Sequence, residues 1–167
     1  MEQIQLRQKL EDLRQGKIPP GELYATIHDF GRAYFLEARP DVERFLTHPD
    51  SQYRGLAIHV LASDWRLPEC WETARKMLLT DPDVDCRMKA ASALQALKRD
   101  TQDHPTLEVL AGVVTNQQEE QIVREVAYAA MRGVVKYDPR EQFRFANEGL
   151  VVQEVDWNWV RSFLQAK

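Results

Sequence analysis

Apolar residues recur every three or four positions along most of the chain, which is the spacing of one face of an α-helix. The segment 68–79 shows this spacing with Trp71, Ala74, Met77 and Leu78. No segment shows convincing alternation of apolar and polar residues, the pattern of a half-buried strand. The pattern therefore predicts an all-α protein.

Three segments of the chain, 47–61, 80–94 and 116–131, are similar to one another. The first two copies are 33 residues apart, and the second and third are 37 apart. A period of this size with helical patterning indicates a helical solenoid. The copies share an arginine (Arg54, Arg87, Arg124), an alanine three residues later (Ala57, Ala90, Ala127) and a Leu or Met four residues after that (Leu61, Leu94, Met131).

Each copy divides into an outer helix and an inner helix, and the inner helix contains the shared arginine. In the second copy we expect Asp81 to be the N-cap of the inner helix, with Pro82 in the first helical position. A weaker fourth copy is centred on Arg161, without the alanine. The expected outer and inner helices span 40–47 and 49–65, 68–79 and 82–98, 105–115 and 119–137, and 139–147 and 155–163.

The domain organisation follows from these repeats. At 167 residues the chain fits one domain. Two further helices, 2–15 and 22–38, precede the first copy, and we expect this N-terminal pair to cover the open end of the stack. The sequence thus predicts capping helices over 1–38, three repeats over 39–137 and a degenerate repeat over 138–167.

The Pro-Asp dipeptide, the arginine, the alanine-rich apolar positions and the leucine resemble the HEAT-like repeats of bacterial proteins. Such repeats occur in phycobiliprotein lyases and in many small scaffold proteins. The resemblance covers about residues 40–137 and implies a right-handed superhelical solenoid of antiparallel helix pairs.

The resemblance also implies a role for the shared arginine, which in such repeats often pairs with an acidic loop residue of a neighbouring repeat. The third copy departs from the pattern, because Glu120 replaces the aspartate and the proline is absent. Carried over, the structural ladder would consist of Arg54, Arg87 and Arg124 with Asp50 and Asp83.

Charge and composition narrow the classes of partner and the compartment. The net charge is −4, so the chain lacks the positive field on which non-specific nucleic-acid binding depends. Two cysteines do not make a disulfide framework, and no apolar run approaches the ~20 residues needed to cross a bilayer. The N-terminus has no signal-peptide pattern. We therefore expect a cytoplasmic protein without disulfides, membrane contact or nucleic-acid partner.

Candidate chemistry is sparse. The run 81–85 has carboxylates at positions 1, 3 and 5, as a calcium loop does, but Cys86 and Ser92 stand where the glycine and the bidentate glutamate are needed. None of the four histidines has a partner at zinc-ligand spacing. A phosphate-binding loop and a nucleophile elbow are also missing. The sequence favours a non-catalytic role and predicts no metal, no cofactor and no catalytic residue.

The surface of the inner helices opposite the core is the main candidate site. Leu56, Met88, Ile122 and Val126 fall there and indicate a contact surface, although they could equally fill the seam between inner helices. The rival location is the C-terminal end. Trp157 and Trp159 face some 200° apart on a helix, so we expect one of them to be exposed. The residues expected to bind a partner on the inner-helix surface are His59, Met88, Lys89, Ser92, Gln95, Glu125 and Arg132.

Three hypotheses for function follow. The leading one is a non-catalytic protein-interaction or scaffold module that binds another protein on the concave inner-helix surface. The second is a tetrapyrrole attachment factor, which rests on the resemblance to phycobiliprotein lyases. The third is a DNA alkylation-repair glycosylase, since HEAT-like solenoids occur among these enzymes, and the acidic balance argues against it.

Overall fold

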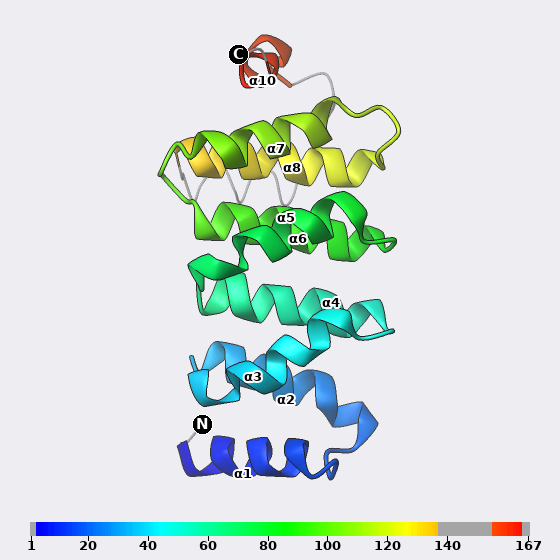
Figure 1. Cartoon of the computed structure of the whole chain (residues 1–167), viewed down its shortest axis with the longest axis vertical. Helices are drawn as coiled ribbons and strands as arrows, with labels where there is room; N and C mark the ends of the chain where they lie inside the picture. The colour runs from blue at the N-terminus through cyan, green and yellow to red at the C-terminus, as the bar shows by residue number, and fades with distance from the viewer. Residues whose placement is uncertain (1–2, 137–154, 165–167) are drawn as a thin grey trace.

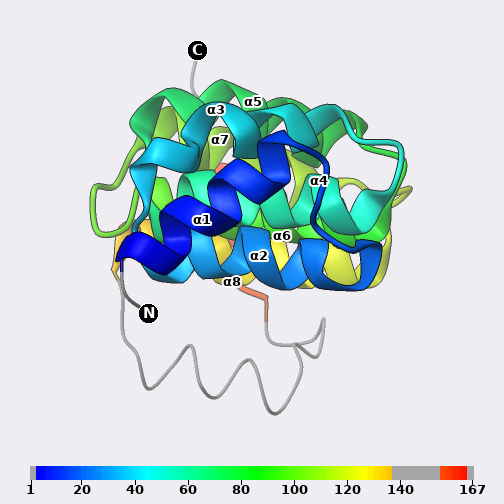
Figure 2. The same cartoon turned by 90° about the horizontal axis from the view of Figure 1, so that it is seen from below.

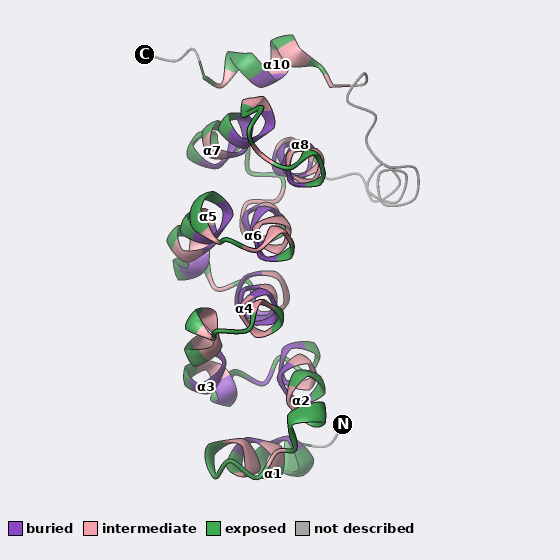
Figure 3. Cartoon of the chain, turned by 90° about the vertical axis from the view of Figure 1, so that its right-hand side faces the viewer, coloured by how far each residue is buried: buried purple, intermediate pink, exposed green. Residues whose placement is uncertain are grey.

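The computed structural model describes residues 3–136 and 155–164, and every regular element within them is a helix. The helices stack in two columns (Figure 3), with α3, α5 and α7 in the first and α2, α4, α6 and α8 in the second. Successive helices alternate between the columns, so each repeat contributes one helix to each. The all-α solenoid predicted from the sequence is confirmed.

The second column holds the inner helices that carry the repeated arginines. It consists of α2 (Pro20–Arg32), α4 (Ser51–Ile58) with its continuation η3 (His59–Asp64), α6 (Val84–Leu97) and α8 (Gln121–Val135). The first column consists of η1 (Leu36–Ala38), α3 (Arg39–Glu43), η2 (Arg44–Thr47), η4 (Pro68–Cys70), α5 (Trp71–Thr80) and α7 (His104–Thr115).

One helix lies over each described end of the stack. α1 (Gln3–Arg14) lies across the N-terminal end (Figures 1 and 2) and buries Leu6 and Leu10. α10 (Trp157–Ser162) packs on α7 at the other end and buries Val160. The expected helix 139–147 lies outside the described residues. Within the described part, no helix is long and apolar enough to cross a membrane.

The hydrophobic core lies between the columns and is continuous along the stack. The repeated alanines Ala57, Ala90 and Ala127 are completely buried. Their small side chains let α6 pack closely against α4 on one side and α8 on the other. Trp65 is the largest fully buried side chain, and its indole N–H donates to the carbonyl of Phe30 at 3.3 Å.

Two helices end or change form where the sequence predicted continuous helix. The segment 22–38 is broken after Arg32, because Tyr34 adopts a left-handed backbone conformation (φ 52°). The segment 49–65 is α-helical only to Ile58 and continues as one π-helical turn, η3. A π-turn carries no strong sequence signal, which explains why the pattern did not reveal it.

The start of α6 also differs from the expectation. Its N-cap is Asp83, whose carboxylate accepts a hydrogen bond from the backbone N–H of Cys86 at 3.0 Å. The prediction that Asp81 caps this helix was wrong by two residues. The side chain of Asp81 is engaged elsewhere, in the contact described next.

Candidate functional site

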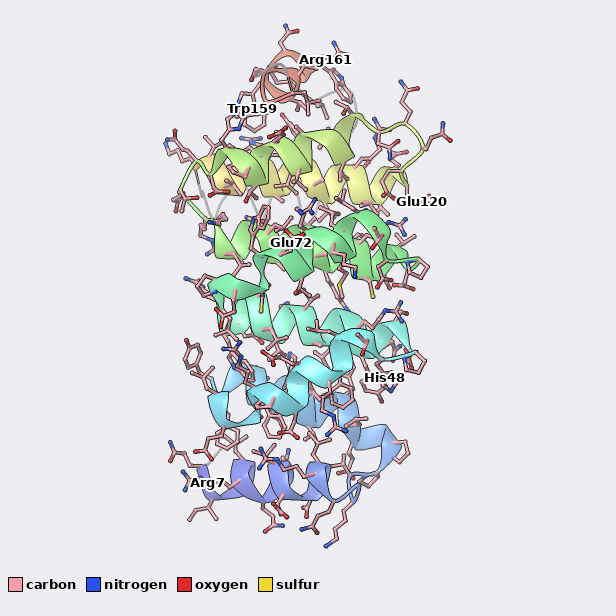
Figure 4. All side chains as sticks on the ribbon, in the orientation of Figure 1. Arg7, His48, Glu72, Glu120, Trp159 and Arg161 are labelled. Carbon is pink, nitrogen blue, oxygen red and sulfur yellow. The ribbon has the colours of Figure 1, made fainter. Side chains whose placement is uncertain are left out.

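One edge of the stack, which carries His48 and Glu120 (Figure 4), holds the loops that join the two helices of each repeat. There the guanidinium of Arg54 donates to both carboxylate oxygens of Asp81, at 2.9 and 2.8 Å. Its third nitrogen donates to the carbonyls of His48 and Pro49, both at 2.9 Å. A single arginine therefore links the loop of its own repeat to the loop of the next.

Arg87 makes the equivalent contacts one repeat later. It donates to Glu119 at 3.1 and 2.8 Å and to the carbonyls of Asp81 and Pro82 at 3.0 and 3.1 Å. Arg124 instead donates to the carbonyl of Val114 at 2.9 Å. Within the described part of the chain, two of the repeated arginines therefore form an ion pair with a carboxylate of the next loop. Arg124 donates to a backbone carbonyl instead.

The acidic partners implied by the family resemblance are wrong. Asp50 and Asp83 are N-caps, of α4 and α6 respectively, and the arginines contact Asp81 and Glu119 instead. An N-cap carboxylate is turned toward the first N–H groups of its own helix, so it is not available to the neighbouring repeat. One further pair precedes the repeats, since Arg14 of α1 donates to the buried carboxylate of Asp41.

These contacts perturb the acidity of the loop carboxylates. The hydrogen bond from Arg54 lowers the pKa of Asp81 below its usual value, against the opposing effect of burial. The backbone N–H of Cys86 likewise lowers the pKa of the Asp83 carboxyl. Both groups are therefore held as carboxylates, and their chemistry is that of structural anchors.

The seven residues expected to bind a partner lie on the outward face of the second column. His59 belongs to η3, and the others belong to α6 and α8. Because α6 packs against both α4 and α8, the three rows are neighbours. We call this set the ridge: Ser92 is exposed, and His59, Met88, Lys89, Gln95, Glu125 and Arg132 are half-buried.

Glycines allow the rows of the ridge to approach closely. The side chain of Lys89 lies across Gly55 of α4, where an added Cβ would be 2.8 Å from its Cδ. Gln95 covers Gly133 of α8 in the same way. Long polar side chains of α6 therefore fill the seams on both sides of that helix, which explains why they are only partly exposed.

Three polar side chains of the ridge, those of Ser92, Glu125 and His59, have contacts within their own helices. Ser92 donates to the carbonyl of Met88 at 3.2 Å, and Gln121 donates to Glu125 at 2.8 Å. His59 lies 3.5 Å from Asp64, one π-turn further along η3. Their polar atoms are spread over three helices rather than converging on one point, as a catalytic constellation requires.

A family profile for HEAT repeats matches residues 40–132 of the chain. This match spans more than half of the sequence and includes all three repeated arginines. The chain belongs to the HEAT-repeat family. Comparisons with curated proteins and with solved structures returned no significant match.

The apolar residues that indicated a contact surface divide between exposed and buried positions in this HEAT-repeat stack. Ile122 is 47% exposed, whereas Leu56 is 1% exposed. Of the two alternatives left open for these residues, Leu56 therefore follows the second, because it is buried between the helices and is not part of an exposed surface. Met88 and Val126 are half-buried and pack against the core.

The C-terminal tryptophans are both half-buried. Trp159 packs edge-on against Tyr128 and Phe163, with ring centroids 6.0 and 5.4 Å away. The ring of Trp157 is covered by the guanidinium of Arg161 at 5.8 Å. The expectation that one of them stands exposed is not met, because the short helix α10 turns one ring onto α8 and shields the other with its own arginine.

Other polar clusters in the described residues offer little further chemistry. Three or more His, Cys, Asp or Glu side chains that could hold a metal ion do not come together there. Burial raises the pKa of Cys86 to about 12, and burial also raises the pKa of Cys70. Neither thiol is therefore a reactive nucleophile at neutral pH.

Sequence reasoning missed Asp64, whose carboxylate lies 3.5 Å from the imidazole of His59 on the ridge. Its second oxygen is buried against Gly31 of α2 without a hydrogen-bond donor among the described residues. The π-turn brings Asp64 to His59 although they are five residues apart. The α-helical periodicity used to assign the faces does not place such a pair together.

Proposed function

We propose that this HEAT-repeat chain is a non-catalytic interaction module that binds another protein across the ridge. HEAT repeats stack into extended surfaces that commonly serve protein binding. The second column supplies such a surface, because α4, α6 and α8 lie in adjacent rows, with α6 in contact with both of the others. In Figure 3, α2 and α8 lie farther out than α4 and α6, so this column bows gently inward.

The observation that carries the proposal is the close packing of polar side chains over the glycine seams. Lys89 and Gln95 lie across Gly55 and Gly133, and packing of this kind restricts the rotamers of a long side chain before any partner arrives. Groups that are already ordered cost less entropy to immobilise at an interface. A row of this kind, extended by Ser92 and Glu125, can serve a partner that buries about 800 Å² on each side.

The experiment compares capture of a partner by immobilised variants incubated with native cell extract. Ser92→Arg adds bulk and charge at an exposed ridge position, and Lys89→Glu reverses a ridge charge. Lys76→Glu is the matched control, because Lys76 is exposed on α5 in the other column. The proposal predicts that both ridge variants lose a partner that the parent and the control retain.

The C-terminal end is the rival location and is tested in the same experiment. Trp157→Ala removes the ring that lies beneath Arg161 without touching the ridge. Loss of the partner in this variant alone would move the site to α10. Retention in all variants would contradict both locations.

The two alternative functions, a tetrapyrrole attachment factor and a DNA alkylation-repair glycosylase, remain predictions that rest on the family resemblance. Visible absorbance after incubation with a bilin tests tetrapyrrole attachment, and a gel shift with alkylated duplex DNA tests the glycosylase. Either positive result would replace the interaction module as the function of this chain.

A further inference from the structure

The opposite edge of the stack, on the left in Figure 1, holds the connections from one repeat to the next. Two of these connections place a bulky residue in the left-handed backbone region, Tyr34 after α2 and Arg66 after η3, both with φ of 52°. Asp100 and Gln102 have the same sign of φ after α6. Glycine is the usual residue at this position after a helix, because a side chain there costs conformational energy.

The backbone around Tyr34 shows the usual helix-ending pattern for that position. The N–H of Tyr34 donates to the carbonyl of Gly31 and that of Phe35 to the carbonyl of Phe30, both at 2.9 Å. Glycine would satisfy the same two bonds with less strain. Tyrosine adds a hydroxyl that bonds the neighbouring connection, which glycine cannot supply, and more than half of the residue remains exposed.

The two connections lie side by side. The hydroxyl of Tyr34 donates to the carbonyl of Trp65 at 3.2 Å, and the indole of Trp65 donates back to the carbonyl of Phe30 at 3.3 Å. Arg66 is the residue directly after Trp65, so its backbone is adjacent to the Tyr34 side chain. Both connections are thus held in place by packing that is already part of the core.

Exposed apolar and cationic groups gather around this contact. Tyr34 is 56% exposed and Leu36 is 42% exposed, large fractions for side chains of this type. Arg32, in the last turn of α2, and Arg66 are also exposed. We call these four residues, Arg32, Tyr34, Leu36 and Arg66, the Tyr34 edge.

The two arginines of the Tyr34 edge make no ion pair with any described residue. Nearby carboxylates are engaged elsewhere: Asp29 pairs with Lys9 at 2.6 Å and Glu37 with Arg7 at 2.9 Å. Asp64 turns one oxygen toward His59 and buries the other beside Gly31. Glu69 pairs with Arg39 at 2.6 Å. Two exposed guanidinium groups without a carboxylate partner among the described residues thus lie at this edge, in a chain whose net charge is −4.

We propose that the Tyr34 edge is a second protein-binding surface, which takes an acidic peptide segment with an apolar side chain. The carboxylates of the segment pair with Arg32 and Arg66, and its apolar side chain packs on Tyr34 and Leu36. Tyrosine and arginine are the residue types that dominate binding energy at protein interfaces. Leu36 contributes nothing to a phosphate backbone, and two arginines are few for nucleic acid, so a peptide fits the composition better. This surface is separate from the ridge and does not depend on the ridge.

The test uses phage-displayed random twelve-residue peptides selected on the full-length protein. Individual selected peptides are then labelled with fluorescein, and their affinities are measured by fluorescence polarisation. The expected peptides are rich in Asp and Glu with at least one large apolar residue. The expected affinity for Arg66→Gly is at least about tenfold lower than for the parent.

The glycine variant separates binding from folding. Because glycine relieves the left-handed strain, Arg66→Gly is expected to melt at the parent temperature or above it. The double variant Arg32→Gln with Arg66→Gln removes both charges and keeps the side-chain length. Ser92→Arg, on the ridge, serves as the control and is expected to bind the peptides as the parent does.

Three outcomes would overturn the proposal. In the first, the selected peptides lack acidic residues. In the second, Arg66→Gly and the double glutamine variant bind the peptides as tightly as the parent does. In the third, a twelve-nucleotide single-stranded DNA binds the parent more tightly than the peptides and loses binding with Arg66→Gly, which assigns the edge to nucleic acid.

Discussion

Arg54 on α4 holds both carboxylate oxygens of Asp81, a residue 27 positions later in the loop of the next repeat. The side chains of the pair are only 13% and 8% exposed. The same guanidinium also binds two carbonyls of its own loop. This one residue therefore fixes the register between successive repeats, and its removal leaves a nearly buried carboxylate without its partner.

Replacing Arg54 by Ala should destabilise the protein by about 2–3 kcal/mol, between the values of exposed and fully buried pairs. Chemical denaturation monitored by circular dichroism measures the loss. Arg75→Ala is the control, because its pair with Glu72 lies on the solvent-exposed side of α5, and no clear loss is expected there. Equal stabilities of Arg54→Ala and the parent would remove the structural role of this contact.

Arg87 provides an independent case one repeat later. Its pair with Glu119 is similarly shielded, with side chains 14% and 12% exposed. We expect Arg87→Ala to lower the melting temperature clearly while capture of a partner, measured below that temperature, is unchanged. A variant that melts like the parent and loses only partner binding would place Arg87 in the binding site instead.

Acid should lower the stability of the folded protein, in part through protonation of Asp81. Its pKa is depressed in the folded state by the hydrogen bond from Arg54, so its stabilising contribution is complete above the unfolded pKa of about 3.9. That contribution is lost as the pH falls from there through the lower, folded pKa. In urea denaturation, the free energy of unfolding should therefore fall less between about pH 5 and pH 3 for Asp81→Asn than for the parent. Parallel pH profiles for the two proteins would contradict this assignment.

The repeated arginines illustrate what sequence alone could predict. Their spacing and the alanine three residues later identified the solenoid, because the core requires a small residue at that place in every repeat. Their acidic partners were not predictable in the same way. Asp50, Asp81 and Asp83 all lie near helix starts, and which of them caps and which reaches the neighbouring repeat depends on how the loops meet in space.

The breaks in the helices also escaped sequence reasoning. The apolar pattern continues through 33–38 and 59–65, so it gave no reason to end a helix at Arg32 or to change its form at His59. The two breaks meet at Trp65, which is buried, donates to the carbonyl of Phe30 and accepts a hydrogen bond from the hydroxyl of Tyr34. The assignment of faces by α-helical angle was therefore least reliable beyond these points, and it missed Asp64.

Replacement of glycine by alanine should have opposite effects at an open helix position and at a closely packed one. Gly112 lies on the exposed side of α7 with no atom near its added Cβ, so Gly112→Ala should stabilise the protein by about 0.5–1 kcal/mol through helix propensity. Gly31→Ala should instead destabilise by about 1–3 kcal/mol, because its Cβ would meet Val60 at 2.9 Å and the buried oxygen of Asp64. Thermal melts of both variants measure the contrast. Stabilisation by both substitutions would show that the contact between α2 and η3 is looser than described.

The two cysteines should react slowly with thiol reagents in the native protein. Both are buried, and burial raises the pKa of each thiol, to about 12 for Cys86. At about pH 8, where a free cysteine is partly ionised, labelling with dithionitrobenzoate should be complete only after denaturant is added. Rapid labelling of the native protein would show that one of these thiols is accessible.

This low native reactivity permits a direct test of the ridge as the partner-binding surface. A thiol introduced by Ser92→Cys on α6 is exposed, and a matched thiol introduced by Lys76→Cys lies on α5 in the other column. The labelling rate of each variant is measured with and without a saturating amount of the captured partner. The account predicts that the partner slows labelling at position 92 at least about tenfold, as burial in an interface requires, and leaves position 76 unchanged. Equal protection at both positions, or protection at position 76 alone, would contradict binding across the ridge.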